Sequence, residues 1–108
     1  MRVMSEVNEI VRIIKKYLLD IYGKKIKQVI LYGSFARSEA TEDSDVDILV
    51  VVADELNFKK VEEDLNDLLF EILIEKGELV TVMAIKETTF NNYKSPLLLN
   101  IKEEGITI

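Results

Sequence analysis

The sequence contains no cysteine and no histidine. Without cysteine there is no disulfide framework, no thiolate nucleophile and no cysteine-based zinc site. Without histidine, the Ser-His-Asp and Cys-His mechanisms and the usual transition-metal sites are excluded. Any chemistry must therefore depend on carboxylates, hydroxyls, lysine, arginine, or a hard metal ion bound by oxygen ligands.

Glycine and proline are scarce, with four and one residues among 108. No linker, repeat or low-complexity segment is present, and the length suits one domain over residues 1–108. No apolar run approaches the roughly 18 residues of a membrane span, and the first residues show no signal-peptide pattern. We therefore expect a cytoplasmic domain that does not enter a membrane.

Charge is distributed unevenly along the chain. Residues 1–37 carry eight basic and three acidic side chains, whereas residues 38–108 carry six and seventeen. The net charge of −6 argues against a generic nucleic-acid binder, because phosphate contacts need clustered positive charge. The alternative explanation for both regions is that their charged side chains simply form a solvent-exposed surface.

The spacing of apolar residues predicts helices over 5–22, 57–76 and 95–105. The expected capping residues are Ser5, Asn57 and Ser95 at the amino ends and Gly23, Gly77 and Gly105 at the carboxyl ends. The apolar Pro96–Ile101 stretch either packs onto the sheet or docks a partner.

Strands are predicted over 28–32, 45–52 and 79–85, with a short helical turn over 35–38. Five consecutive apolar residues in the second strand indicate burial on both faces. The order of elements predicts an α/β (α+β) fold of two layers, with a small mixed sheet covered by helices on one main face.

Two carboxylates begin the second strand. Asp45 and Asp47 are two residues apart, so they project from the same face of the strand, with roughly 6.6 Å between Cα atoms. Unpaired, they would repel each other and lose hydration, and a divalent cation removes both penalties. Mg²⁺ suits carboxylate and phosphate oxygens best. The alternative is that both acids merely start the strand at the surface.

Gly33 and Ser34 end the first strand. Gly33 allows a sharp turn and close approach of a ligand to the backbone, and the N–H and hydroxyl of Ser34 can meet phosphate oxygens. Arg37 either contacts a triphosphate or pairs with an acid of the following loop, namely Glu39, Glu42 or Asp43. Taken alone, Gly-Ser is also an ordinary strand-to-helix turn.

Together these residues spell G-S-x₁₀-D-x-D, which resembles the signature of the DNA polymerase β-like nucleotidyltransferase superfamily. The short chain and the G-S-F-A-R run look most like its minimal nucleotidyltransferase (MNT) branch, and the resemblance covers about residues 5–85. It implies the α-β-α-β-α-β core of that family and an Mg²⁺-dependent enzyme. In that enzyme Asp45 and Asp47 would hold the metal, and Gly33, Ser34 and Arg37 would bind the NTP.

The resemblance also implies a partner. Minimal transferases of this type occur as antitoxins beside HEPN-family toxins and transfer AMP from ATP to a toxin tyrosine. We therefore expect ATP as substrate, a HEPN-family protein as partner and a homo- or hetero-oligomer, with nucleic acid not expected as a partner.

The chain departs from the family in its third core strand. Active members commonly add a third carboxylate there, whereas residues 79–85 contain no acid. Thr81 is expected at the metal-facing position, and Glu78 at the strand edge is the nearest substitute and a candidate catalytic residue. An alternative is thus a catalytically weak NTP-binding module that neutralises its partner by complex formation. A transferase for a small molecule such as an aminoglycoside is a third reading, although no second substrate-holding domain is present.

Overall fold

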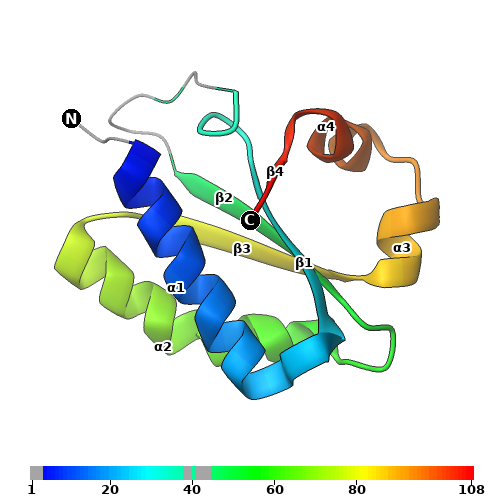
Figure 1. Ribbon diagram of the computed structural model, residues 1–108, viewed down its shortest axis with the longest axis horizontal. Helices are drawn as coiled ribbons and strands as arrows, with labels where there is room; N and C mark the ends of the chain where they lie inside the picture. Colours follow the sequence, from blue (N-terminus) through cyan, green and yellow to red (C-terminus); the bar gives the residue numbers. More distant parts are fainter. Residues whose placement is uncertain (1–3, 38–39, 41–44) are drawn as a thin grey trace.

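The computed structural model describes residues 4–37, 40 and 45–108 and contains a four-stranded sheet with helices on both faces (Figure 1). The elements are α1 (Met4–Tyr22), the 3₁₀ helix η1 (Gly23–Lys25), β1 (Ile26–Tyr32), β2 (Val46–Val52), α2 (Phe58–Lys76), β3 (Val80–Lys86), α3 (Glu87–Asn92), α4 (Pro96–Glu104) and β4 (Ile106–Thr107).

The sheet has the strand order β3-β2-β1-β4. β2 is paired on both sides, with β1 antiparallel and β3 parallel to it, and β4 is antiparallel to β1. The predicted mixed sheet is therefore confirmed. Its register places Tyr32, Asp47 and Thr81 side by side on three neighbouring strands.

Both faces of β2 are buried, as the apolar run predicted. Val46, Ile48 and Val50 join the larger core cluster, which α1 and α2 complete. Leu49 and Val51 alternate with them and join a smaller cluster on the opposite face. Because successive strand residues point to opposite faces, one apolar strand serves two cores.

Helices cover the second face as well. The long helices α1 and α2 cover the main face, and α3 and α4 lie on the other (Figure 1). Phe90 of α3 and Leu98 and Ile101 of α4 are buried against that second face. Packing on the sheet is therefore the outcome for Leu98 and Ile101, whereas Leu97 is 47% exposed. The prediction missed α3 and β4, because six and two residues are too short to show a periodic pattern.

Most predicted helix ends are confirmed. Asn57 Oδ1 accepts hydrogen bonds from the N–H groups of Lys59 and Lys60, at 3.0 and 3.3 Å, and Gly77 is left-handed with φ 68°. The prediction of Ser5 as N-cap is wrong, because α1 already begins at Met4. The extra helical residue leaves Ser5 inside the first turn.

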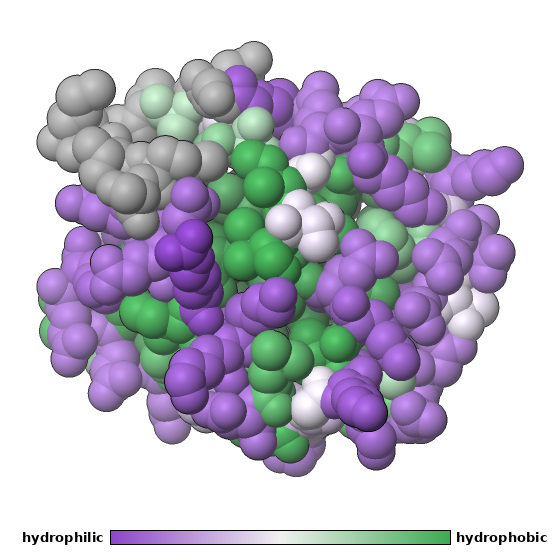
Figure 2. Space-filling view, viewed as in Figure 1, coloured by the Kyte–Doolittle hydropathy of each residue, from purple (hydrophilic) through white to green (hydrophobic). Residues whose placement is uncertain are grey.

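The surface is a mixture of hydrophilic and apolar side chains, with apolar ones gathered near the centre of the face in view (Figure 2). No helix within the described ranges combines the length and apolarity needed to cross a bilayer.

Leu65 and Leu73 of α2 test the assignment of the main core. Leu65 is fully buried and Leu73 is 39% exposed. Leu65→Ala is expected to lower the free energy of unfolding by about 2–5 kcal/mol, because it leaves a cavity among α1, α2 and the sheet. Leu73→Ala, on the same helix, should lower it by less than about 1 kcal/mol. Urea denaturation measures both, and equal losses would contradict the assignment.

Candidate nucleotide and metal site

The turn after β1 brings Gly33 against Asp47. Gly33 has φ 76°, a left-handed conformation that suits glycine. A Cβ atom placed on Gly33 would lie 2.5 Å from Asp47 Oδ2, closer than real Cβ contacts. The Asp47 carboxylate therefore occupies the space that a side chain at position 33 would need.

The residues after Gly33 form one turn rather than the predicted short helix. The Arg37 N–H donates to the Gly33 carbonyl oxygen over 3.2 Å, and Ser34 is half-buried between them. Phe35 is 5% exposed and belongs to the main core, so it anchors the turn to the sheet. Ser38, the expected end of this helix, and the loop acids Glu39, Glu42 and Asp43 lie outside the described residues.

The two predicted carboxylates lie close enough to affect each other. Burial raises the pKa of the Asp47 carboxyl above its ordinary value, and the charge of Asp45 adds to the rise. The Arg37 guanidinium partly opposes it. Burial and the charge of Asp47 also raise the pKa of the Tyr32 hydroxyl. The site thus carries an excess of negative charge, which a cation would relieve.

Arg37 extends toward α4. Its Nη1 atom lies 3.8 Å from Glu104 Oε2, and both side chains are partly exposed. A cavity of about 150 Å³ opens between α4 and the turn, with Tyr32, Gly33 and Asn100 among its lining residues. Of the residues predicted to bind an NTP, Gly33 and Arg37 both line this cavity.

Thr81 is the β3 residue in register with Asp47, at the position where a third acid was expected. Its side chain is exposed. Within residues 4–37, 40 and 45–108, no group of three acidic side chains is close enough to share a metal ion. Asp45 and Asp47 are therefore the metal-ligand candidates in this part of the chain.

Glu78 is not brought to Asp47. It is 7% exposed and lines a different pocket, together with Glu6, Glu9 and Lys76. That pocket lies against α1, on the main face of the sheet, whereas Asp47 alternates with main-core residues and so projects from the other face. Glu78 and Asp47 therefore lie on opposite faces of the sheet.

Comparison with known proteins decides the family. A profile described as "Nucleotidyltransferase domain" matches residues 11–106. The chain belongs to the nucleotidyltransferase domain family. This confirms the family and the enzyme class predicted from the sequence.

Relatives of this nucleotidyltransferase have related names. It is 44% identical over 87 residues to "Putative protein adenylyltransferase MJ1379" of Methanocaldococcus jannaschii, covering 79% of this chain and 84% of that protein. It is 39% identical over 72 residues to "Protein adenylyltransferase MntA" of Thermococcus cleftensis, covering 64% of this chain and 71% of that one.

Solved structures share the fold. A crystal structure described as a toxin-antitoxin with AMP-PNP aligns with a TM-score of 0.57 at 19% identity, covering 87% of this chain and 68% of that chain. A nucleotidyltransferase structure from Sulfolobus solfataricus aligns with a TM-score of 0.59 at 16% identity, covering 96% and 80%. The predicted nucleotidyltransferase fold is thus confirmed.

Two residues of the candidate site were missed from the sequence. Tyr32 is the cross-strand neighbour of Asp47, and its place directly before the Gly-Ser turn was an available signal. Glu104 is the ion-pair partner of Arg37. It lies 67 residues away along the chain, so no local pattern could have identified it.

Gly33 and Gly23 provide a matched test of the close contact. Both have a left-handed φ, but a Cβ on Gly23 would meet no atom within 4 Å. Gly23→Ala is expected to cost only about 1–2 kcal/mol of backbone strain. Gly33→Ala should cost more, because it must also displace the Asp47 carboxylate. Thermal denaturation of both variants measures the difference, and equal losses would count against the contact.

Proposed function

We propose that the chain is an Mg²⁺-dependent adenylyltransferase that transfers AMP from ATP to a hydroxyl group of a partner protein. The partner is a HEPN-family toxin, the hydroxyl belongs to a tyrosine, and the chain acts as the antitoxin. The observation that carries the proposal is the contact of Asp47 with the Gly33 turn, because it brings a carboxylate pair next to the turn that we propose binds phosphate.

The donor set fits Mg²⁺. Asp45 and Asp47 supply hard oxygen ligands, and Mg²⁺ is commonly held by one or two carboxylates together with substrate phosphates. Burial raises the pKa of the Asp47 carboxyl and the charge of Asp45 adds to the rise, so a cation bound at this pair would stabilise the ionised form. A bound Mg²⁺ would supply charge neutralisation for the triphosphate and lower the pKa of the acceptor hydroxyl.

The side chains have separate roles in the proposed transfer. Asp45 and Asp47 hold the cation, while the Gly33 turn and Ser34 N–H position phosphate oxygens, and Arg37 contributes positive charge next to them. The acceptor oxygen forms a bond to the α-phosphorus, and the bond from that phosphorus to the β-phosphate bridging oxygen breaks. Its electron pair leaves with pyrophosphate, and the hydroxyl proton passes to water.

Names of relatives support the choice of acceptor. Several relatives are named as protein adenylyltransferases, and structures that share the fold are described as toxin-antitoxin complexes, one with AMP-PNP. The cavity at the turn has a volume of about 150 Å³, which is small for enclosing an acceptor molecule beside a nucleotide. This supports presentation of the hydroxyl by a second protein.

Asp45→Asn and Asp47→Asn test the enzyme directly. With labelled ATP, Mg²⁺ and a HEPN-family protein encoded beside this chain, each change is expected to reduce label transfer at least ~100-fold, because the triphosphate loses its charge partner. Asp67→Asn removes an exposed carboxylate of α2 and should leave transfer unchanged.

Stability separates a functional from a structural loss in these variants. Without metal, Asp47→Asn should unfold at the same temperature as the parent or higher, because it removes a half-buried charge next to Asp45. Loss of transfer together with a large drop in melting temperature would mean that Asp47 is structural.

A second candidate function is supported by Thr81. No acid occupies the β3 position in register with Asp47, which favours a weak catalyst that binds NTP and neutralises its partner by complex formation. In this case ATP and the toxin still bind, but label transfer is absent in the parent protein.

Thr81→Asp distinguishes the two functions. If the site is catalytically weak because it lacks a third carboxylate, this change should raise the transfer rate about tenfold or more, by adding a base and ligand beside Asp47. Thr89→Asp, at an exposed residue of α3, serves as the charge control. The binding module would be excluded if the parent protein transfers label efficiently and Thr81→Asp transfers less.

A further inference from the structure

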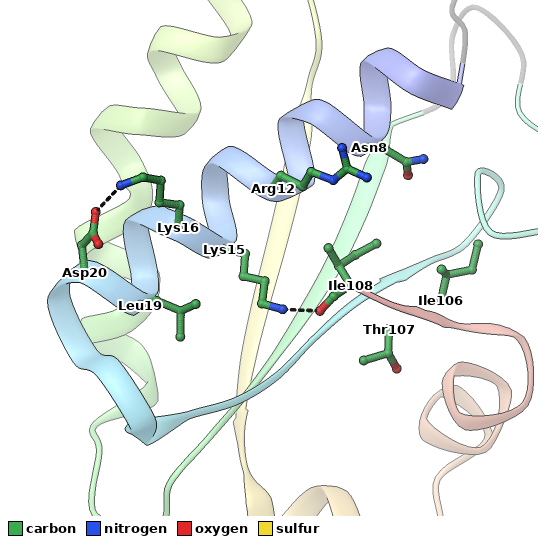
Figure 3. A pocket seen from close by; sticks show the side chains of 9 residues that line it. All are labelled: Asn8, Arg12, Lys15, Lys16, Leu19, Asp20, Ile106, Thr107 and Ile108. Atoms are coloured by element: carbon green, nitrogen blue, oxygen red, sulfur yellow. Dashed lines mark hydrogen bonds and ion pairs between the residues drawn. The ribbon is translucent and has the colours of Figure 1, made fainter.

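A second cavity lies away from the proposed active site. It is a groove of about 700 Å³ between α1 and the β4 segment (Figure 3). Arg12, Lys15 and Leu19 line it from one side, and Ile106 and Ile108 line it from the other. β4 is an edge strand that pairs with β1 alone, so the groove follows the edge of the sheet.

The groove is positively charged in an acidic protein. Three cationic side chains, Arg12, Lys15 and Lys16, line it together with one acidic side chain, Asp20. The whole chain carries −6. Lys16 already pairs with Asp20 over 3.2 Å, and Arg12 is exposed with no ion pair inside the described ranges.

The groove also has an apolar floor. Leu19 is 40% exposed and Ile106 is 39% exposed, and Ile108 packs partly against the main core. In Figure 2, apolar side chains gather near the centre of the face that carries α1 and β4, with hydrophilic ones around them. Apolar floor and cationic rim together match a ligand that is both apolar and anionic.

The groove already holds extended backbone. The Lys15 ammonium donates to the main-chain oxygen of Ile108 over 2.6 Å (Figure 3). The Ile108 N–H donates to the Val29 oxygen over 2.9 Å. A lysine on α1 thus recognises a carbonyl group of a segment that runs along the sheet edge.

From these features we infer that the groove between α1 and β4 binds an extended, acidic and partly apolar segment of a partner protein. Carboxylates of the segment would face Arg12 and Lys16, and its apolar side chains would cover Leu19 and Ile106. Nucleic acid is a poorer match, because the acidic remainder of the chain repels a long polyanion, whereas a short segment is affected mainly by the local charge.

The groove is distinct from the proposed nucleotide site but near it. Ile106 pairs with Leu31, which is two residues before Gly33, or about 7 Å along the strand. Asp47 projects from the other face of the sheet, away from α1. A segment in the groove would therefore anchor a partner beside the active site without covering it. Binding of a segment in the groove does not depend on the proposed function. Only the statement that this partner is also the acceptor protein rests on it.

A random heptapeptide display library tests the groove with the full chain and without catalysis. At physiological salt, the selected peptides are expected to be rich in Asp, Glu and apolar residues. Binding of one selected peptide, measured by fluorescence anisotropy, should weaken about tenfold or more in Arg12→Glu, because the reversed charge repels it.

Controls make each outcome decisive. Lys24→Glu makes the same change in charge at an exposed η1 residue outside the groove and should leave peptide affinity within about twofold of the parent. Asp47→Asn should also leave peptide affinity unchanged. Peptide binding by a parent protein that shows no label transfer would count against the proposed enzyme alone. Three outcomes would overturn the groove proposal. The library could select basic peptides, Arg12→Glu and Lys24→Glu could weaken binding equally, or a short oligodeoxythymidine could displace the peptide at the same salt.

Discussion

The approach of Asp47 to the Cα atom of Gly33 is the contact on which the site depends. Only a residue without Cβ permits it, because any side chain there would overlap the carboxylate. The left-handed φ of Gly33 also reverses the chain at the end of β1, so the Ser34 N–H and the aspartates come to one end of the sheet. One glycine thus sets both the direction of the turn and the place of the carboxylate.

The carboxylates are held in this position by a strand that cannot move independently. β2 contributes alternately to the cores on both sides of the sheet and is hydrogen-bonded to β1 and β3. A strand fixed in this way keeps Asp47 half-buried beside Asp45 despite the unfavourable charge, which is reflected in its raised pKa. The free energy gained by packing the two cores offsets the unfavourable burial and repulsion of the two carboxylates, and the same pair is suited to bind a cation.

In the proposed enzyme, the acidic pair and the basic groove bind different ligands. Small, metal-bound phosphate groups meet the acidic end of the sheet, while a partner segment meets the cations of α1 at the sheet edge. Because the two lie on different faces, binding at one does not require displacement at the other. The uneven charge of the sequence, basic before residue 38 and acidic after it, becomes meaningful only in this arrangement.

The sequence by itself determined the long helices, the three core strands, the caps at Asn57 and Gly77, and the Gly33-Ser34 and Asp45–Asp47 motif, because these depend on local conformation and short periods. The tertiary structure alone decided that Glu78 and Asp47 lie on opposite faces of the sheet, that Thr81 lies beside Asp47, and that Glu104 reaches Arg37. It also decided that β4 and α1 enclose a groove. These are relations between distant segments. They are fixed by strand register and by the burial of α3 and α4 against the sheet, and a local sequence pattern does not specify which segments meet.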